Sequence, residues 1–295
     1  MSGPTAASVR VWRRLGAHAR TALIRDLPAE DLRIILSDVA RARATVSSEE
    51  DLLTRWREDA FLQPSLADPR LTLALQTRLW QALPSDFEAV SLSPFTALGS
   101  VTRLSGTGQN RVVSTMRGSE VVYDPVHPLA LEASRRRRGG YTRVHLAACV
   151  QSAHAWEVDE APRHETRFAA VSSAPDGGSW STEVSLMAAH LGFWIEALLP
   201  VLPTVRLEVV AWEDTARDRL QDSGALDHER VSWGGDGPMW RHPYTVAAFR
   251  IMTDDGASLG DGGLVQWTQA LTGNRKDRCV ISGVSLETAA SLVAA

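Results

Sequence analysis

Two residues of opposite charge, Arg117 and Glu120, stand at the end of a strand-like segment that reads "NRVVSTMRGSE". Residues three positions apart on a regular strand point to opposite faces, so this pair can converge only if Gly118 and Ser119 break the strand. One structure for a converged pair is a salt-bridged turn. Any joint chemistry of these two side chains therefore depends on a kink in the backbone.

Other charged or titratable residues offer weaker signals. His145, His154 and His164 are too widely spaced for one helical face and lack a paired carboxylate at metal-ligand spacing, so no metal site is predicted.

The run Arg135–Arg138 could contact RNA phosphates, but cations also suit a helix C-terminus and charge runs are usually solvated. Glu183 suits a helix start as a cap. No GxSxG elbow or Cys–His spacing indicates a nucleophile.

Composition narrows the class of protein. The chain has 295 residues, 44% hydrophobic and 22% charged, with a formal charge of −4, which argues against bulk coating of nucleic acid. Its two cysteines, Cys149 and Cys279, lie in apolar stretches without a CxxC spacing and are expected to be buried free thiols. No signal peptide and no apolar run of about 18 residues is found, so we expect a soluble, cytoplasmic protein without a membrane role.

The elements that would position these residues fall into two regions. Residues 1–85 carry apolar positions at helical spacing, as in "LPAEDLRIILSDVARAR", and form a predicted helical N-terminal region. Residues 86–295 carry short strand-like segments and two clear helices, one after Pro128 and one in "STEVSLMAAHLGFWIEALLPVL". The predicted strands are 89–95, 110–116, 144–150, 167–173, 205–212, 245–253 and 279–285. Strands outnumber helices without alternating with them, which favours an α+β fold with a mostly antiparallel sheet flanked by helices.

Two glycine-rich stretches, 233–240 and 254–263, are predicted to be loops, the second leading into a helix at 264–271. Neither has the GxGxxG or Walker pattern of a nucleotide site. In the second stretch Asp261, Gly262 and Gly263 could let the backbone approach a ligand closely. A loop that needs positive φ would explain the same glycines.

The order of elements from residue 86 onward resembles the catalytic core of class II aminoacyl-tRNA synthetases, closest to the histidyl branch and its paralogues. The segment "MRGSEVVYDPVHPLALEASRRRR" is similar to that branch's Arg-Pro-Glu segment before a helix, and "VHLAACVQSAHAWEVDEAPRHETRF" is similar to motif 2. The helix "STEVSLMAAHLGFWIEAL" follows, and "GGLVQWTQALTGNRKDRCVISGVSLETAASL" is similar to the run into motif 3. The resemblance implies an antiparallel sheet of about six strands.

The resemblance also implies roles for particular residues. In the family the first segment faces the small-molecule pocket, where Glu120 would receive an amino group and Arg117 an anionic group; a salt-bridged turn stays the alternative. The further substrate-binding candidates are Arg163, His164 and Arg167 in the motif 2 loop and returning strand, Glu183, and Gly262 with Gly263. Of these, His164 is the candidate acid or base.

This chain departs from the family where ATP would be held. The motif 2 strand reads "AACVQSAHAW" without its arginine, and motif 3 has Thr288 after Glu287 where the family has arginine. Threonine cannot supply a bidentate cationic contact to phosphate. The candidates for relocated cations are Arg163, Arg167, Arg275 and Arg278. The chain ends at the motif 3-like helix, so no anticodon-binding extension and no ordinary charging of tRNA are expected.

We therefore expect a non-translational, homodimeric paralogue that binds an amino acid or a related metabolite and has a degenerate ATP site. Its nearest analogue in concept is the regulatory subunit that histidine biosynthesis derived from this scaffold. The alternative is an enzyme, an ATP-dependent amino-acid-activating ligase or aminoacyl transferase, with ATP and Mg²⁺ as cofactors. A third alternative is an unrelated α+β protein whose strand order mimics the family.

Overall fold

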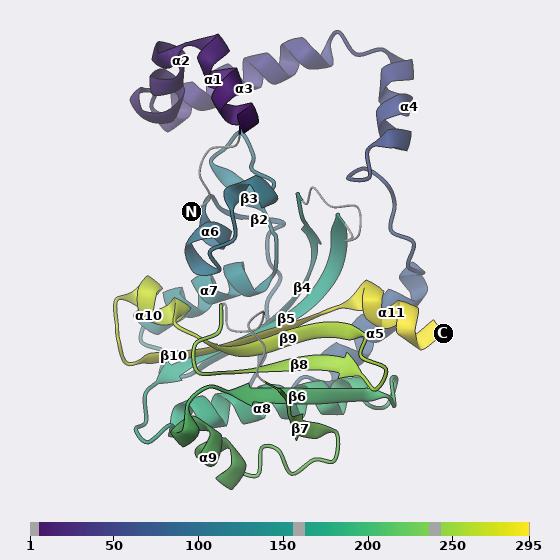
Figure 1. Ribbon diagram of the computed structural model, residues 1–295, viewed down its shortest axis with the longest axis vertical. Coiled ribbons are helices and arrows are strands. Elements are labelled where there is room, and N and C mark those ends of the chain that lie inside the picture. The colour runs from purple at the N-terminus through teal and green to yellow at the C-terminus, as the bar shows by residue number, and fades with distance from the viewer. Residues whose placement is uncertain (1–5, 156–162, 236–242, 295) are drawn as a thin grey trace. The chain divides into compact units, whose positions relative to one another are not determined.

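A computed structural model describes residues 6–155, 163–235 and 243–294 (Figure 1). The chain forms two compact units. The first combines Met1–Pro64, Phe95–Val121 and His154–Arg163, and the second combines Ser65–Pro94, Val122–Ala153 and His164–Ala295. Part of the predicted motif 2 loop (156–162) and part of the predicted loop at 233–240 lie outside the described residues. The proposed boundary between residues 85 and 86 stays a prediction.

The second unit is built on one large sheet. In the described residues it has eight strands in the order β1-β4-β5-β10-β9-β8-β6-β7. Their bounds are β1 Glu88–Ala89, β4 Val144–Ala153, β5 His164–Pro175, β6 Val205–Ala211, β7 Val231–Trp233, β8 Ala247–Thr253, β9 Ser258–Val265 and β10 Asp277–Ser285. Of the strand pairs that the structure describes, only the edge pairs β1·β4 and β6·β7 are parallel. The α+β fold with a mostly antiparallel sheet is confirmed. The sheet has eight strands where about six were expected, because it includes the short edge strands β1 and β7.

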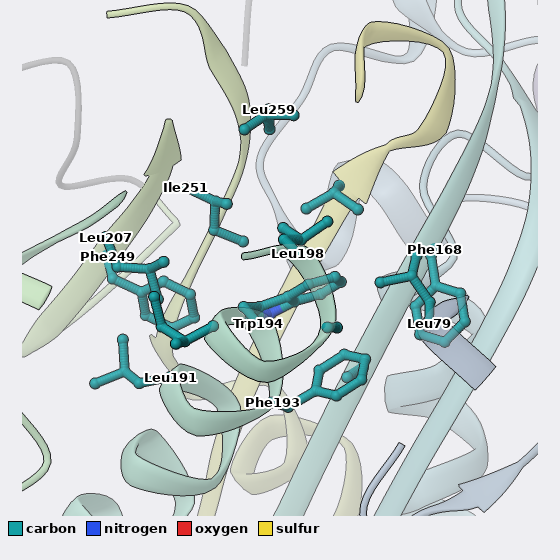
Figure 2. Close-up of a cluster of buried hydrophobic side chains, with 14 of the residues drawn as sticks. Leu79, Phe168, Leu191, Phe193, Trp194, Leu198, Leu207, Phe249, Ile251 and Leu259 are labelled. Carbon is teal, nitrogen blue, oxygen red and sulfur yellow. The ribbon is translucent and has the colours of Figure 1, made fainter. Parts of the chain in front are cut away.

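One face of this sheet forms the hydrophobic core. The long helix α8 (Ser181–Leu198) lies across it next to α5 (Pro69–Ala82), and α11 (Leu286–Ala294) packs against α5. Figure 2 shows Trp194 and Phe193 of α8 among side chains from the strands, including Phe168 of β5 and Phe249 of β8. Each such buried aromatic or aliphatic side chain stabilises the fold by about 1.5–3 kcal/mol. The helical spacing of Met187, Leu191, Trp194 and Leu198 in the sequence predicts one apolar face, and all four residues belong to this core.

The opposite face is partly covered by α7 (Val126–Arg138) and α10 (Trp267–Thr272). The arginine run at the end of α7 is used within the unit. Arg137 forms a buried ion pair of 2.6 Å with Asp277, and Arg138 donates to the carbonyl oxygen of Leu271 at 2.7 Å. The two preceding arginines bind Glu132 and lower the pKa of its carboxyl group to about 2. These contacts favour a structural role for Arg135–Arg138.

The described elements of the first unit are mostly helices. They are α1 Ala6–Leu15, α2 Ala17–Thr21, the π-helical turn η1 Ala22–Asp26, α3 Ala29–Ala44, α4 Glu49–Glu58, α6 Ser100–Leu104 and the 3-10 turn η2 Gln109–Arg111, with a small sheet of β2 Phe95–Ala97 and β3 Ser119–Val121. α4 begins with a capping box in which Ser48 and Asp51 bind each other's backbone N–H groups. The remaining described helix, α9 (Asp214–Asp222), belongs to the second unit.

Three local predictions are wrong. The expected strand 89–95 contains only the end of β1 and the start of β2. The stretch 254–263 is not a loop throughout, because β9 begins at Ser258 and runs between β8 and β10. The glycines of β9 are a packing requirement: a Cβ on Gly262 would lie 2.5 Å from both Phe249 Cζ and Ser282 Cβ. The expected strand at 110–116 is the η2 turn followed by a single bridge from Ser114 to Glu120. The glycines therefore led to a loop being predicted where β9 lies, and the apolar residues of 110–116 led to a strand being predicted where a turn lies.

A chain of hydrogen bonds crosses the core beneath the sheet. Trp194 Nε1 donates to Ser282 Oγ at 2.8 Å, and that hydroxyl lies 2.7 Å from His190 Nδ1. His190 Nε2 lies 2.8 Å from Ser172 Oγ, which lies 2.7 Å from His145 Nδ1. Because indole can only donate, every member is satisfied when each hydroxyl donates onward and His190 is the neutral Nε2–H tautomer. The network therefore requires an uncharged His190.

This requirement predicts how stability depends on pH. Burial, with a smaller contribution from His145, lowers the pKa of His190 to about 3, while an unfolded histidine titrates near 6.5. Below about pH 6.5 the unfolded chain therefore binds a proton that the folded chain excludes, and this group lowers the free energy of unfolding by about 1.4 kcal/mol per pH unit. Urea unfolding between pH 7.5 and 5 measures this slope. The slope of the unfolding free energy against pH should decrease in His190→Gln and stay unchanged in the control His228→Gln, where the histidine is exposed. Equal slopes in the unsubstituted protein and both variants would contradict the assignment of this pH dependence to His190.

Candidate functional site

A row of charged residues crosses three neighbouring strands of the second unit. Glu208 of β6 is the register partner of Arg250 of β8, and Arg250 is the partner of Asp261 of β9. Directly opposite residues on adjacent strands point to the same face of a sheet. The neighbours Leu207 and Phe249 belong to the core packed on α8. The charged row, Glu208, Arg250 and Asp261, therefore lies on the face away from α8.

Asp261 is the most accessible carboxylate of this row. It is exposed, yet the surrounding protein raises its pKa by desolvation, while Tyr244 and Arg167 act in the opposite direction. Tyr244 is buried, and its hydroxyl donates to Asp261 Oδ2 at 2.8 Å. Burial, followed by the charge of Asp261, raises the Tyr244 pKa well above its ordinary value, so the phenol stays a donor at neutral pH. One carboxylate oxygen is thus held in place while the residue stays open to solvent.

Arg167 of β5 lies beside the row and is held by two carboxylates. Its Nε is 3.0 Å from Asp124 Oδ2, and its NH1 donates to Glu165 Oε1 at 2.9 Å. Burial opposes the charge of Arg167, but Asp124 and Glu165 outweigh it and raise the arginine's pKa. Asp124 also accepts from the N–H of Val126 at the start of α7. Among the described residues, Arg167 is the predicted charged site residue that the structure brings to the charged row.

Arg117 and Glu120 belong to the first unit and do not form an ion pair with each other in the described structure. Gly118, with a φ of +68°, makes a turn that leaves Arg117 exposed at its tip. Glu120 is fully buried: its two oxygens accept from the N–H groups of Gly99 at 2.8 Å and Val101 at 3.0 Å, and from Gln109 Nε2 at 2.9 Å. The predicted kink exists, and Glu120 binds the start of α6.

Glu183 lies at a different place in the second unit. In the first turn of α8, it accepts from Arg278 Nε at 2.5 Å, and Arg278 also pairs with Asp176 at 2.7 Å. Arg278 and the register partner of Arg167, Ser285, stand seven residues apart on β10, about 23 Å at strand spacing. Glu183 and Arg278 are therefore far from the charged row, and both are engaged in ion pairs.

The remaining candidates lie on the strands or next to them. Gly262 faces Phe249 in the core, and a Cβ on Gly263 would lie 2.6 Å from the Ala247 carbonyl oxygen and 2.7 Å from Tyr244 Cδ1, so close packing explains both glycines. His164 begins β5 opposite Ala153, half-buried, and the carbonyl of Arg163 accepts from the N–H of His154 at 2.7 Å. Arg275 is exposed. None of these positions contradicts a ligand contact, and none supplies one.

Five residues of the site were not predicted from the sequence. They are Asp124, Glu165, Glu208, Tyr244 and Arg250. A usable signal exists in two strands, because "VRLEVV" and "AAFRIM" place a charge at alternating positions inside otherwise apolar runs. The sequence holds no comparable signal for Asp124 or Tyr244, since both lie outside regular strands.

Neither a metal nor a reactive thiol is supported in the described part of the chain. Among those residues no group of three or more His, Cys, Asp or Glu side chains could hold a metal ion. Cys149 and Cys279 are free thiols, and burial raises the pKa of each to about 12, which keeps them protonated. No described helix is both long and apolar enough to cross a bilayer.

A separate hollow of about 430 Å³ lies along α8, away from the charged row. Its lining includes Leu191, Gly192, Ile195 and Leu199. Arg78 also lines it, but its guanidinium donates to the main-chain oxygens of Glu196 and Ala197. The hollow is mostly apolar and lacks the converging polar groups of a reactive site.

Solved structures share this fold. The chain is similar to a histidine–tRNA ligase subunit from Alicyclobacillus acidocaldarius, with a TM-score of 0.59 and 13% identity over 79% of this chain and 96% of that chain. It is similar to apo histidyl-tRNA synthetase from S. aureus, with a TM-score of 0.59 and 13% identity over 79% of this chain and 68% of that chain. It is also similar to an ATP phosphoribosyltransferase regulatory subunit/histidyl-tRNA synthetase from Bacillus halodurans, with a TM-score of 0.58 and 10% identity over 76% of this chain and 79% of that chain. No family model and no curated protein matches the chain. The resemblance to the class II, histidyl-like core is thus confirmed at the level of the fold.

The contacts of Glu120 predict that replacing Glu120 lowers stability much more than replacing Arg117. Glu120→Ala would leave the half-buried N–H of Gly99 and the buried N–H of Val101 without their acceptor, at a cost of about 1–3 kcal/mol of stability. Arg117→Ala, at an exposed turn, should change stability by less than about 0.5 kcal/mol. Urea unfolding of both variants measures this. A comparable loss in both would mean that the two side chains act together.

Proposed function

We propose that the protein binds an amino acid or a closely related metabolite at the charged row and does so without standard adenylation. The observation that carries this proposal is the register pair Arg250 and Asp261, which offers opposite charges side by side on one face of the sheet, with Asp261 open to solvent. A zwitterion presents a matching pair of charges over a similarly short span. Charge-assisted hydrogen bonds between such groups are about twice as strong as neutral ones.

Each group has a definite part in this binding. The Asp261 carboxylate, oriented by Tyr244, would accept hydrogen bonds from the ligand's ammonium group. Arg250 would receive the ligand's carboxylate, since a guanidinium binds carboxylates in a planar, bidentate way. Burial lowers the pKa of Arg250, whereas Glu208 and Asp261 favour its charged form. A bound carboxylate would compensate that desolvation.

Two of the four arginines that were candidates to replace the family's ATP contacts support a degenerate ATP site. Arg167 is bound by Asp124 and Glu165, and Arg278 by Glu183 and Asp176. Two carboxylates around one guanidinium leave a net negative charge, which opposes a phosphate at these two arginines. At the motif 3-like position, Thr288 donates its N–H and hydroxyl to Ser285 Oγ at 3.2 and 3.1 Å. Such a protein would act as a binding or regulatory subunit, a homodimer in this proposal, rather than by charging tRNA.

A second candidate function has its own observation. Arg206 lies on the same face as the charged row, two residues from Glu208 along β6, and the two side chains form an ion pair. Together with Arg250 it could hold a phosphate, which would suit an ATP-dependent ligase or aminoacyl transferase with Mg²⁺ bound through the substrate. ATP-dependent exchange of pyrophosphate with one amino acid would favour this enzyme.

Thermal stability in the presence of single amino acids, ATP-Mg²⁺ and both tests the proposal. A ligand at about 100 times its Kd stabilises the native state by about 2.7 kcal/mol, which raises the midpoint by several degrees. We expect a shift with one amino acid and none with ATP. Asp261→Asn should weaken that ligand at least tenfold, whereas Asp222→Asn, the same change on exposed α9, should not.

Other results of this experiment have equally definite meanings. A shift with ATP that a single amino acid enhances would favour the ligase. An amino-acid shift that survives Asp261→Asn would place the ligand elsewhere. No shift with any amino acid would contradict binding at the charged row.

A further inference from the structure

The helices of the first 64 residues expose apolar surface that a folded helix normally buries. α1, α2, α3 and α4 contain no buried residue. Thirteen of the twenty large hydrophobic residues that are exposed in the described chain lie within residues 6–64, about a fifth of it. Single exposed apolar residues are ordinary, but a concentration of this kind marks an interaction surface.

α3 exposes Ile35, Leu36 and Val39, and two shorter helices carry the same kind of surface as regular stripes. In α4, Leu52, Leu53 and Trp56 recur at spacings of three and four residues and are 53–59% exposed. In α1, Val11 and Leu15 lie one turn apart and are similarly exposed. A helix of ten residues is marginal in water by itself and obtains most of its stability from packing its apolar face. Both helices therefore need a partner surface.

The charges beside the two stripes are opposite. The segment Ala6–Thr21, which holds α1 and α2, has four arginines and no acidic residue, whereas α4 has four acidic residues and two arginines. In the described chain, Arg13 and Arg14 of α1 form no ion pair, and neither do Glu49 and Glu50 of α4. Each helix thus offers the charge that the other lacks.

We propose that α1 and α4 form an interface between two copies of this chain, with α1 of one copy packed against α4 of the other. A two-fold arrangement would use both contacts twice, because an isologous interface pairs the same surface on each subunit. It would bury the apolar stripes and pair arginines with carboxylates at their edges. The proposal is independent of the ligand at the charged row.

The overall charge of the segment favours a second copy over an anionic partner. Residues 1–64 contain ten arginines and nine aspartates or glutamates, a net charge of +1. Helices that lie on anionic membranes, and surfaces that bind RNA, carry a clear excess of positive charge. A balanced but segregated charge pattern fits self-association, in which each basic helix meets an acidic one.

Disulfide trapping between copies tests the contact directly. One copy carries Arg14→Cys and the other Glu50→Cys, and the control partner carries Val46→Cys, which lies on the same segment and is 81% exposed. The native Cys149 and Cys279 are partly or fully buried, and the unsubstituted protein reports their background. We expect the Arg14→Cys and Glu50→Cys copies to cross-link at least ten times faster than the control pair. Equal rates, or only an intrachain disulfide when one chain carries both substitutions, would overturn the proposal.

Charge reversal gives an independent readout by sedimentation. Arg13→Glu with Arg14→Glu, or Glu49→Arg with Glu50→Arg, should raise the dissociation constant of self-association at least tenfold, and combining the four changes should restore it. Asp218→Arg with Asp222→Arg on exposed α9 makes the same change in charge as the α4 variant and should have no effect. Failure of the combined variant to recover would overturn the pairing of these helices. So would flotation with phosphatidylglycerol vesicles by a chain that does not self-associate.

Discussion

The alternation of side chains across the central antiparallel strands is the constraint on which the rest of the structure depends. Because successive residues point to opposite faces, β6 and β8 can supply Leu207 and Phe249 to the core while presenting Glu208 and Arg250 on the other side. A slip of register by one residue would exchange these roles and bury charge against α8. The core and the candidate site are therefore two faces of the same strands.

Charge is distributed unevenly over this framework. Most arginines of the second unit that the sequence offered as ligand contacts are already bound by carboxylates, as Arg137 is by Asp277 and Arg278 by Glu183. Burying such groups is tolerated only when they are paired. Asp261 differs because it is open to solvent and is oriented by a neutral phenol. This difference, more than any motif, distinguishes the charged row from the structural ion pairs around it.

The resemblance to class II synthetases predicted the fold from an order of degenerate motifs, and the similar solved structures bear it out at 10–13% identity. Individual residues carried over less well. Glu120 caps the start of α6, and Gly262 makes room for Phe249. A fold tolerates wide substitution as long as the apolar pattern persists, whereas a site depends on the geometry of particular side chains.

Local patterns in the sequence determined the α+β class, the packing face of α8 and the kink at Gly118, because apolar periodicity and turn residues act over a few neighbours. They also indicated that the cysteines are free thiols. Only the tertiary structure decided which charges meet. Asp124, Arg167, Tyr244 and Asp261 come from segments up to 137 residues apart, and pairing of β5, β10, β9 and β8 brings them together. Such proximity depends on strand order and register, which no short stretch of sequence encodes.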